Sequence, residues 1–362
     1  MRKKRKNLVF GLVYVLIISG IIGYFSYLGL MSTQLSKKYP SYGILIFSDS
    51  DFLKYDLPGS GTQTDPYIIE NYSILTSEHS AIQIERVTKY VIIRNNYLRS
   101  RVSALEIEDS VGSRIKIINN TCVGSVYPTA DDYCGIYIYN SDGCFIYNNT
   151  FLNLDTGIDL HVSDNCSIIH NHFENQRINI IIVGSRKVNI ENNSLILYEQ
   201  VEGPYYHESL YIFNSKNISI KKNTIENGGL IFHETNASSL IVQDNLVNGF
   251  ELGYFIDETY LEINSSTLFG QLFFINCNNS IIRNQEIRTT NEGISLINCL
   301  NFNISFCNFS DNHFGVSASY SNNINLVNNT FMSNMFGIYL HNSNCTYNQN
   351  NFYNNTYNVY TS

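Results

Sequence analysis

The stretch "GIYIYNSDGCFIYNNTF", Gly135 to Phe151, decides the fold because it holds one complete unit of a repeat. Its first residues alternate, with Ile136 and Ile138 on one face and tyrosines on the other, which is the period-two pattern of a β-strand. A polar turn, "NSDG", follows, and a second short strand carries Ile146. The final "NNTF" closes a corner and starts a third strand. The stretch therefore predicts three short strands joined by tight corners.

The unit recurs about twelve times, and equivalent positions are most often about 22 residues apart. Each unit ends on an apolar residue: Leu98, Cys122, Phe151, Phe173, Leu195, Ile225, Val247, Leu268, Ile287, Phe309, Phe331 and Phe352. Leucine-rich repeats have a similar length but contain several leucines and a single asparagine, and helical repeats need about 33 residues or more. The repeat therefore predicts an all-β, single-stranded parallel β-helix, in which coils stacked about 4.8 Å apart form a rod of roughly 55 Å.

The excess of asparagine has a structural explanation. Asparagine tolerates left-handed backbone conformations better than other non-glycine residues, and its amide pairs with an amide one coil above or below. One column of such residues comprises Asn96, Asn120, Asn149, Asn171, Asn193, Asn223 and Asn245, and Asn329 and Asn350 resume it. The sequence predicts that this column is a structural ladder and not an active site.

The stretch "GSGTQTDPYIIENYSI", Gly59 to Ile74, precedes the regular coils. A phosphate-binding loop needs a lysine after its last glycine, whereas Gly61 is followed by Thr62 and then by a strand-like run. The end of a solenoid must be covered, because an open coil exposes strand edges and the core. We therefore expect residues 44–80 to form an N-terminal cap with the first coil, and residues 81–362 to form the β-helix.

The N-terminus predicts a membrane anchor. Five basic residues in "RKKRK", Arg2 to Lys6, precede an uncharged apolar run from Leu8 to Met31, which is long enough to span a bilayer. The basic side stays in the cytoplasm, so residues 1–7 are the cytoplasmic tail, 8–31 the single-pass transmembrane signal anchor, 32–43 a linker, and the rest is extracytoplasmic at the cell membrane. A cleaved signal peptide is the alternative. Without the basic cluster, 18 basic residues oppose 31 acidic ones, which disfavours nucleic acid as a partner.

The "GSGTQTDPYIIEN" stretch and the coils that follow resemble the right-handed parallel β-helix proteins of the NosD-like, pectin-lyase-like superfamily, with repeats of the carbohydrate-binding and sugar-hydrolysis type. The resemblance covers roughly residues 44–352 and implies the handedness of the coil. It implies several functions, since the superfamily includes polysaccharide lyases, hydrolases, epimerases and an accessory protein of copper-enzyme maturation. The Gly-His-Gly of polygalacturonase-type hydrolases is absent, and "RIK" at Arg114 to Lys116 stands alone, so no catalytic residue is carried over.

Two insertions lengthen the repeat, "GSVYPTADDYC" (Gly124 to Cys134) and "YEQVEGPYYHES" (Tyr198 to Ser209). Both leave the same corner of the coil, three coils apart, and loops on a rigid scaffold often carry binding sites. Their aromatic rings and carboxylates suit sugar rings and hydroxyl groups. We predict ligand-binding residues in the loops and on the strand face between them: Tyr127, Tyr133, Tyr137, Asp159, His161, Tyr205, Tyr206 and His207. The candidates for catalysis are the loop carboxylates Asp131, Asp132, Glu199 and Glu202. Packing of the loops on the strands alone is the competing interpretation.

The cysteines and histidines give weaker signals. Eight cysteines suit burial as small apolar residues, although Cys144 with Cys166, Cys277 with Cys299, and Cys122 with Cys134 are alternative disulfide pairs. His161, His170 and His172 share a coil but lack the spacing of a zinc site, so no metal ligand is predicted, and calcium on the loop acids is the one cofactor considered. Many N-x-S/T sequences agree with an extracytoplasmic glycoprotein.

These observations favour a membrane-anchored extracytoplasmic β-helix that binds glycans, such as a polysaccharide or a surface glycoprotein, or another cell-surface partner. Because the catalytic motifs of the family are absent, the interpretation as a non-enzyme leads. A polysaccharide lyase, hydrolase or epimerase is the first alternative, since the loops are rich in acids. A structural surface rod, or a NosD-like accessory protein in metal maturation, is the second.

Overall fold

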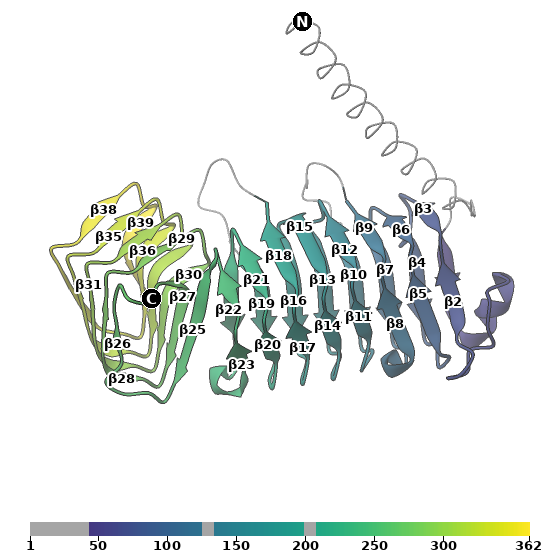
Figure 1. The fold of residues 1–362 in the computed structure, drawn as a ribbon, viewed down its shortest axis with the longest axis horizontal. Helices are drawn as coiled ribbons and strands as arrows, with labels where there is room; N and C mark the ends of the chain where they lie inside the picture. The colour runs from purple at the N-terminus through teal and green to yellow at the C-terminus, as the bar shows by residue number, and fades with distance from the viewer. Residues whose placement is uncertain (1–42, 125–133, 199–207) are drawn as a thin grey trace, which may run out of the picture.

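The computed structural model describes residues 43–124, 134–198 and 208–362. Short parallel strands stack into a β-solenoid of about thirteen turns, one more than the repeat predicts, with the right-handed sense that the family resemblance implies (Figure 1). The coil before Leu98 is already regular, because Ile74 pairs in register with Leu98. Three 3-10 helices interrupt the coils: η1 (Asp49–Lys54), η2 (Gly112–Arg114) and η3 (Ala237–Ser239).

Three sheets form the N-terminal segment, residues 44–247. The β1 sheet contains β1 (Ile44–Ile46), β4 (Ile82–Glu85), β7 (Ser103–Glu108), β10 (Cys134–Tyr139), β13 (Thr156–His161), β16 (Ile178–Val183), β19 (Glu208–Phe213) and β22 (Gly229–His233). The β2 sheet contains β2 (Tyr67–Glu70), β5 (Val91–Arg94), β8 (Ile115–Ile118), β11 (Phe145–Tyr147), β14 (Ser167–Ile169), β17 (Asn189–Glu191), β20 (Ser219–Lys221) and β23 (Ile241–Gln243). The long sheet begins with β3 (Ser73–Leu75), β6 (Tyr97–Arg99), β9 (Thr121–Val123), β12 (Thr150–Leu152), β15 (His172–Gln176), β18 (Ser194–Leu197), β21 (Thr224–Glu226) and β24 (Leu246–Val247).

The C-terminal segment, residues 250–361, continues the long sheet and adds two new ones. The long sheet goes on with β25 (Phe250–Ile256), β27 (Phe269–Ile275), β30 (Glu292–Ile297), β33 (Phe314–Ser319), β36 (Phe336–His341) and β39 (Tyr357–Thr361). The β26 sheet contains β26 (Glu262–Ile263), β28 (Asn278–Arg283), β31 (Leu300–Ser305), β34 (Asn322–Val327) and β37 (Cys345–Asn348). The β29 sheet contains β29 (Glu286–Arg288), β32 (Asn308–Ser310), β35 (Thr330–Met332) and β38 (Asn351–Tyr353).

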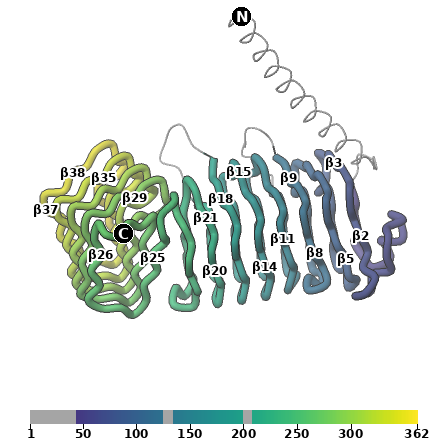
Figure 2. The backbone as a smooth tube through the Cα atoms, viewed as in Figure 1, coloured from purple at the N-terminus to yellow at the C-terminus, as the bar shows by residue number. Residues whose placement is uncertain are grey.

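A hairpin between β24 and β25 breaks the stack. Asn248 and Gly249 have φ angles of 50° and 82°, which suit the two-residue turn that an Asn-Gly pair favours. β25 then runs antiparallel to β24, and the strands of the long sheet become the first strand of each coil instead of the third. Figures 1 and 2 show the first coils from the side and the last coils nested, so the solenoid bends here and is not one straight rod.

The hairpin also corrects one repeat position. Leu268 was predicted to point inward at a corner, but its side chain is 38% exposed. The hairpin shifts the phase of the repeat, so the neighbouring Phe269 is buried instead. Regular pairing resumes with Ile287, which lies opposite Phe309 in the β29 sheet.

Two hydrophobic clusters fill the interior, one for each segment. Strand β27 belongs to both clusters and is buried along its whole length. Leu272 and Phe274 pack into the cluster of the C-terminal segment, whereas Phe273 and Ile275 pack into that of the N-terminal segment. The outer face of the long sheet therefore closes the last coil of the N-terminal segment.

Asparagine ladders join the coils, as predicted. In the column from Asn96 to Asn245, each side-chain oxygen from Asn120 onward accepts hydrogen bonds from the backbone N–H and the side-chain amide of the asparagine one coil before. The column resumes between Asn329 and Asn350. A serine ladder, which was not predicted from the sequence, runs alongside the asparagine column. Each serine hydroxyl accepts a hydrogen bond from a backbone N–H one coil before, and the ladder contains Ser110, Ser141, Ser163, Ser185 and Ser215.

A side chain covers the outer edge of strand β1, the first strand of the solenoid. The Tyr55 hydroxyl hydrogen-bonds both the N–H and the carbonyl oxygen of Leu45 on this strand.

All eight cysteines are free thiols and six are buried, which agrees with their interpretation as small apolar residues. Across the described ranges, no helix is long and apolar enough to cross a bilayer; the predicted anchor at 8–31 lies outside these ranges.

Candidate functional site

The outer face of the β1 sheet carries the described candidate residues. Strand register places Glu106, Tyr137 and Asp159 side by side on β7, β10 and β13. A second row, two residues further along the same strands, contains Glu108, Tyr139 and His161. Because the strands alternate inward and outward residues, both rows point away from the core.

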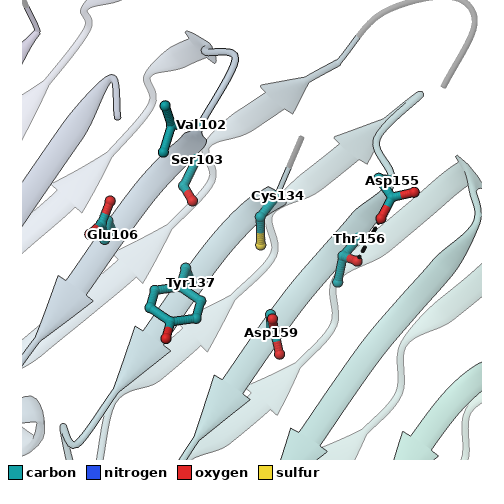
Figure 3. Close-up of a pocket in the computed structure, with 8 residues that line it drawn as sticks. All are labelled: Val102, Ser103, Glu106, Cys134, Tyr137, Asp155, Thr156 and Asp159. Carbon is teal, nitrogen blue, oxygen red and sulfur yellow. Dashed lines mark hydrogen bonds between the residues drawn. The ribbon is translucent and has the colours of Figure 1, made fainter. Parts of the chain in front are cut away.

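These residues line a groove of about 330 Å³, which we call the Tyr137 groove (Figure 3). It is lined by Val102, Ser103, Glu106, Cys134, Tyr137, Asp155, Thr156 and Asp159. The groove lies at the corner where the first insertion rejoins the β1 sheet, since Cys134 begins β10. The second insertion rejoins the same sheet at β19, three strands further on, or roughly 14 Å at the usual strand spacing.

Neighbouring side chains hold the carboxylates of Glu106 and Asp159, on either side of Tyr137, in place. The Ser80 hydroxyl and the Gln83 side-chain amide donate hydrogen bonds to Glu106, the latter over 3.2 Å. On the other side, Nε2 of His161 lies 2.7 Å from Oδ1 of Asp159. The hydrogen bond with Asp159 raises the pKa of His161, against the opposing effect of burial. The two carboxylates are thus pre-oriented acceptors, and His161 favours its charged form.

The site is acidic around an aromatic centre. Burial, followed by the charges of Glu108 and Asp159, raises the pKa of the Tyr137 hydroxyl to about 12, so Tyr137 stays neutral and its hydroxyl group can donate to a ligand. Burial, followed by repulsion from Glu106 and Glu85, raises the pKa of Glu108. Burial also holds the pKa of the Cys134 thiol well above its usual range, so this thiol is a poor nucleophile. The groove suits neutral, hydroxyl-rich or cationic ligands better than anions.

The predicted site residues divide into two groups. Tyr137, Asp159 and His161 lie in and beside the Tyr137 groove, within hydrogen-bond or ring-contact distance of one another. The other candidates lie outside the described residues: Tyr127, Asp131, Asp132, Tyr133, Glu199, Glu202, Tyr205, Tyr206 and His207. The sequence analysis missed Glu106, because it considered only the strands between the two insertions. The repeat register contained the signal, since "ALEIE" aligns Glu106 with Tyr137.

The three histidines of this coil do not form a joint site, although His161 lies beside the groove. His170 occupies a left-handed corner and His172 lies on β15, whereas His161 lies on β13. Within the part of the chain that the structure describes, no group of three or more His, Cys, Asp or Glu side chains is arranged to hold a metal ion. The "RIK" stretch is structural, because the Arg114 guanidinium lies 5.2 Å from the centre of the Tyr90 ring and donates to the Thr88 carbonyl oxygen.

Two family models match the sequence. The family described as "Right handed beta helix region" matches residues 113–268, and "Periplasmic copper-binding protein (NosD)" matches residues 198–362. Among curated proteins, no sequence matches the chain. The two matches together extend from η2 to the last strand.

Several solved structures are similar in fold. A DFA-IIIase from Arthrobacter chlorophenolicus A6, in complex with GF2, is 13% identical over 88% of this chain and 87% of its own, with a TM-score of 0.40. A double mutant of the periplasmic alginate epimerase AlgG is 12% identical over 85% and 83%, with a TM-score of 0.34. PfbA, a surface adhesin of Streptococcus pneumoniae, is 13% identical over 88% and 93%, with a TM-score of 0.30. At these sequence identities and TM-scores, the similarity gives no evidence about the function of this chain.

Proposed function

We propose that this chain, a right-handed parallel β-helix protein with NosD-like repeats, binds glycans outside the cytoplasm through the Tyr137 groove. One observation carries the proposal: an aromatic ring lies between two carboxylates that other side chains already orient. The ring offers an apolar face to a sugar ring. Carboxylates accept hydrogen bonds from sugar hydroxyl groups, and their fixed positions reduce the entropy lost on binding.

The two insertions extend this proposal. They rejoin the β1 sheet at β10 and β19, on either side of the outward residues of β13 and β16. Their tyrosines and acids are proposed to contact the same ligand, and calcium is proposed as an aid where their carboxylates gather. Residues 8–31 are proposed to hold the protein at the membrane, with the solenoid outside. Protease added to intact cells would then cleave the solenoid but spare the N-terminal tail.

The test is retention of the full-length, detergent-purified protein on a panel of immobilised polysaccharides, with and without calcium. We expect retention on at least one polymer, and a loss of about tenfold or more in affinity for Tyr137→Ala, because the ring face is removed. The matched control is Tyr147→Ala, which removes a tyrosine from the outer face of the β2 sheet in the same coil. Equal retention of both variants, or no retention on any polymer, would reject the Tyr137 groove as a glycan site.

A polysaccharide-active enzyme is the second candidate, favoured by the same pair of carboxylates. Glu106 and Asp159 lie two strands apart, roughly 10 Å between Cα atoms, which leaves room for a sugar and a water between the side chains. The retention assay therefore also follows new reducing and unsaturated ends. Turnover that disappears in Glu106→Gln or Asp159→Asn would convert the proposed binding protein into an enzyme. Retention without turnover would keep it a binding protein.

A further inference from the structure

The C-terminal segment presents a second groove, of about 310 Å³, near the bend. It occupies positions equivalent to those of the Tyr137 groove. The β10 sequence "CGIYIY" and the β30 sequence "EGISLI" both contain a Gly-Ile pair. Cys134 and Tyr137 flank this pair in β10, and Glu292 and Ser295 flank it in β30. The same outward positions of the repeat thus line a groove in each segment, with different side chains.

One row of residues forms the floor of this groove. Strand register places Phe273, Ser295, Ser317 and Tyr339 side by side on β27, β30, β33 and β36. The two serines are small, and the two rings at the ends of the row lie three strands apart, roughly 14 Å between Cα atoms. The row therefore leaves a slot between two aromatic walls, which we call the Glu292 slot.

Further rings from neighbouring strands build up the walls. Phe232, on β22 across the bend, has its ring centre 5.2 Å from that of Phe273. At the other end, the ring of Phe314 lies 5.0 Å from that of Tyr339 and is tilted by 58°. Aromatic faces carry partial negative charge and attract cations. Both ends of the slot thus suit an organic cation.

The carboxyl group of Glu292 is the acid of the slot. It hydrogen-bonds the hydroxyls of Ser295 and Ser317, which lower its pKa, but burial has the larger effect and raises the pKa. None of the described residues that line the slot is a lysine or an arginine. Within the slot, the Glu292 carboxyl group therefore has hydroxyl groups as its polar neighbours and aromatic rings around it. A ligand with a positive charge would stabilise the ionised form of Glu292.

Other titratable groups also lie around Glu292. Burial lowers the pKa of His233 on β22, so this side chain is neutral. His341 on β36 lies next to the Ser362 hydroxyl, and Tyr339 carries a phenol. His313, just before β33, stacks on Phe314 with ring centres 4.2 Å apart. Protonation of His233 at lower pH would repel a cation, so it acts in the same direction as protonation of Glu292.

We propose that the Glu292 slot binds a small organic ammonium ion, with the ammonium group against Glu292 and the remainder between the rings of Phe232 and Tyr339, since Phe273 behind Phe232 is only 1% exposed. The serine hydroxyls of the floor offer hydrogen bonds to hydroxyl groups of the same ligand. An amino sugar and an amino alcohol share this chemistry. The proposal is independent of the Tyr137 groove, since it uses other strands: β27, β30, β33 and β36 of the C-terminal segment and β22 at the bend.

The test is titration of the full-length protein with glucosamine and ethanolamine, and with glucose and N-acetylglucosamine as neutral counterparts. We expect saturable binding of one or both ammonium compounds, at least about tenfold tighter than either neutral sugar. Binding should strengthen as the pH rises through the raised pKa of Glu292, because the carboxyl group then ionises. Binding of glucosamine alone would identify an amino-sugar site, and binding of ethanolamine a site for the ammonium group itself.

Two variants assign the binding to the slot. Glu292→Gln keeps the shape of the side chain and removes its charge, so we expect affinity for the ammonium compound to fall at least about tenfold. Tyr339→Ala removes one wall and should weaken binding without changing the charge. Glu251→Gln, at an exposed position on β25 of the same sheet, is the matched control. Equal binding of glucose and glucosamine, or unchanged binding by folded Glu292→Gln and Tyr339→Ala, would overturn the proposal.

Discussion

Where a corner contains two neighbouring asparagines, the two have different structural roles. The first of each pair, such as Asn148 with a φ of 53°, is exposed and adopts the left-handed conformation. The second, such as Asn149, is 1% exposed and accepts hydrogen bonds from the backbone and side chain of Asn120. The sequence analysis assigned both properties to one column, but the structure divides them between two adjacent positions.

This division predicts different costs for the two substitutions. Asn149→Ala leaves the buried N–H of Asn120 without its acceptor and should lower the free energy of unfolding by about 2–4 kcal/mol. Asn148→Ala removes the side chain that tolerates left-handed backbone, together with its exposed hydrogen bond to Asn119, and should cost about 1 kcal/mol, most of which Asn148→Gly should restore. Thermal or urea unfolding of the three variants measures the difference. A large loss in Asn148→Gly would show that the exposed amide, and not the backbone conformation, matters at that position.

Glu108 should make stability depend on pH. Burial and the nearby Glu106 and Glu85 raise its pKa in the folded state, so the folded protein holds this proton more tightly than the unfolded chain. Stability contributed by the proton is then present below the ordinary pKa of glutamate and is lost as pH rises through the raised value. Glu108→Gln should therefore raise the melting temperature at about pH 7 and have little effect near about pH 4. The exposed Glu226→Gln serves as control, and a Glu108→Gln effect that does not change with pH would contradict this account.

At the scale of strands, most of the architecture could be predicted from the sequence, because each coil repeats the same local pattern. The apolar residues of "GIYIY" and "CFIY" point inward as expected, with Ile136, Ile138 and Ile146 fully buried. The hairpin was not predicted, although "VNGF" contains the Asn-Gly pair that favours it. Because the repeat spacing was assumed to continue unchanged across the hairpin, an inward position was assigned to Leu268, which is exposed.

The candidate site was predicted only in part, for a related reason. Register alone brings Tyr137 next to Asp159, so their proximity follows from the repeat. The groove extends one strand further, to Glu106, and the orienting contacts from Ser80 and Gln83 come from the coil before. The Glu292 slot was not predicted either, because part of its wall is contributed by β22 across the bend. Features that depend on the direction of the solenoid axis cannot be read from the spacing of a repeat.

Gln271 takes the place of a strand neighbour at the bend. Its side-chain amide accepts a hydrogen bond of 3.0 Å from the N–H of Leu230 and donates one of 2.8 Å to the carbonyl oxygen of the same residue. Gln271 is fully buried, and it lies on β27, the strand shared by both hydrophobic clusters. One side chain thus satisfies the backbone of β22 where the β1 sheet ends.

Gln271→Leu should therefore weaken the connection between the two segments. Both backbone groups of Leu230 would be left without partners in a buried place, and the free energy of unfolding should fall by about 2–4 kcal/mol. Gln243→Leu, at an exposed position on β23, is the matched control and should change stability by less than about 0.5 kcal/mol. Equal melting temperatures for the two variants would show that the side-chain amide of Gln271 contributes nothing to the bend.

For the whole molecule, a solenoid with two hydrophobic clusters should unfold in two steps. Each coil contacts mainly its neighbours, so cooperativity passes along the stack and weakens where the stack is interrupted. The interruption is the β24–β25 hairpin, beyond which β27 alone carries buried side chains of both clusters on its two faces. Each transition should then respond to changes in its own cluster.

Two buried isoleucines test this at equal chemical cost. Ile146 and Ile338 are both fully buried, the first in the N-terminal and the second in the C-terminal cluster. Each change to alanine should remove about 2–5 kcal/mol, but from a different transition in scanning calorimetry. Ile146→Ala should lower the melting temperature of one transition and Ile338→Ala that of the other, and Gln271→Leu should separate the two further. A single transition, with a melting temperature that both alanine variants lower equally, would contradict this prediction. The two segments would then unfold cooperatively across the bend, and the two clusters would act as one core.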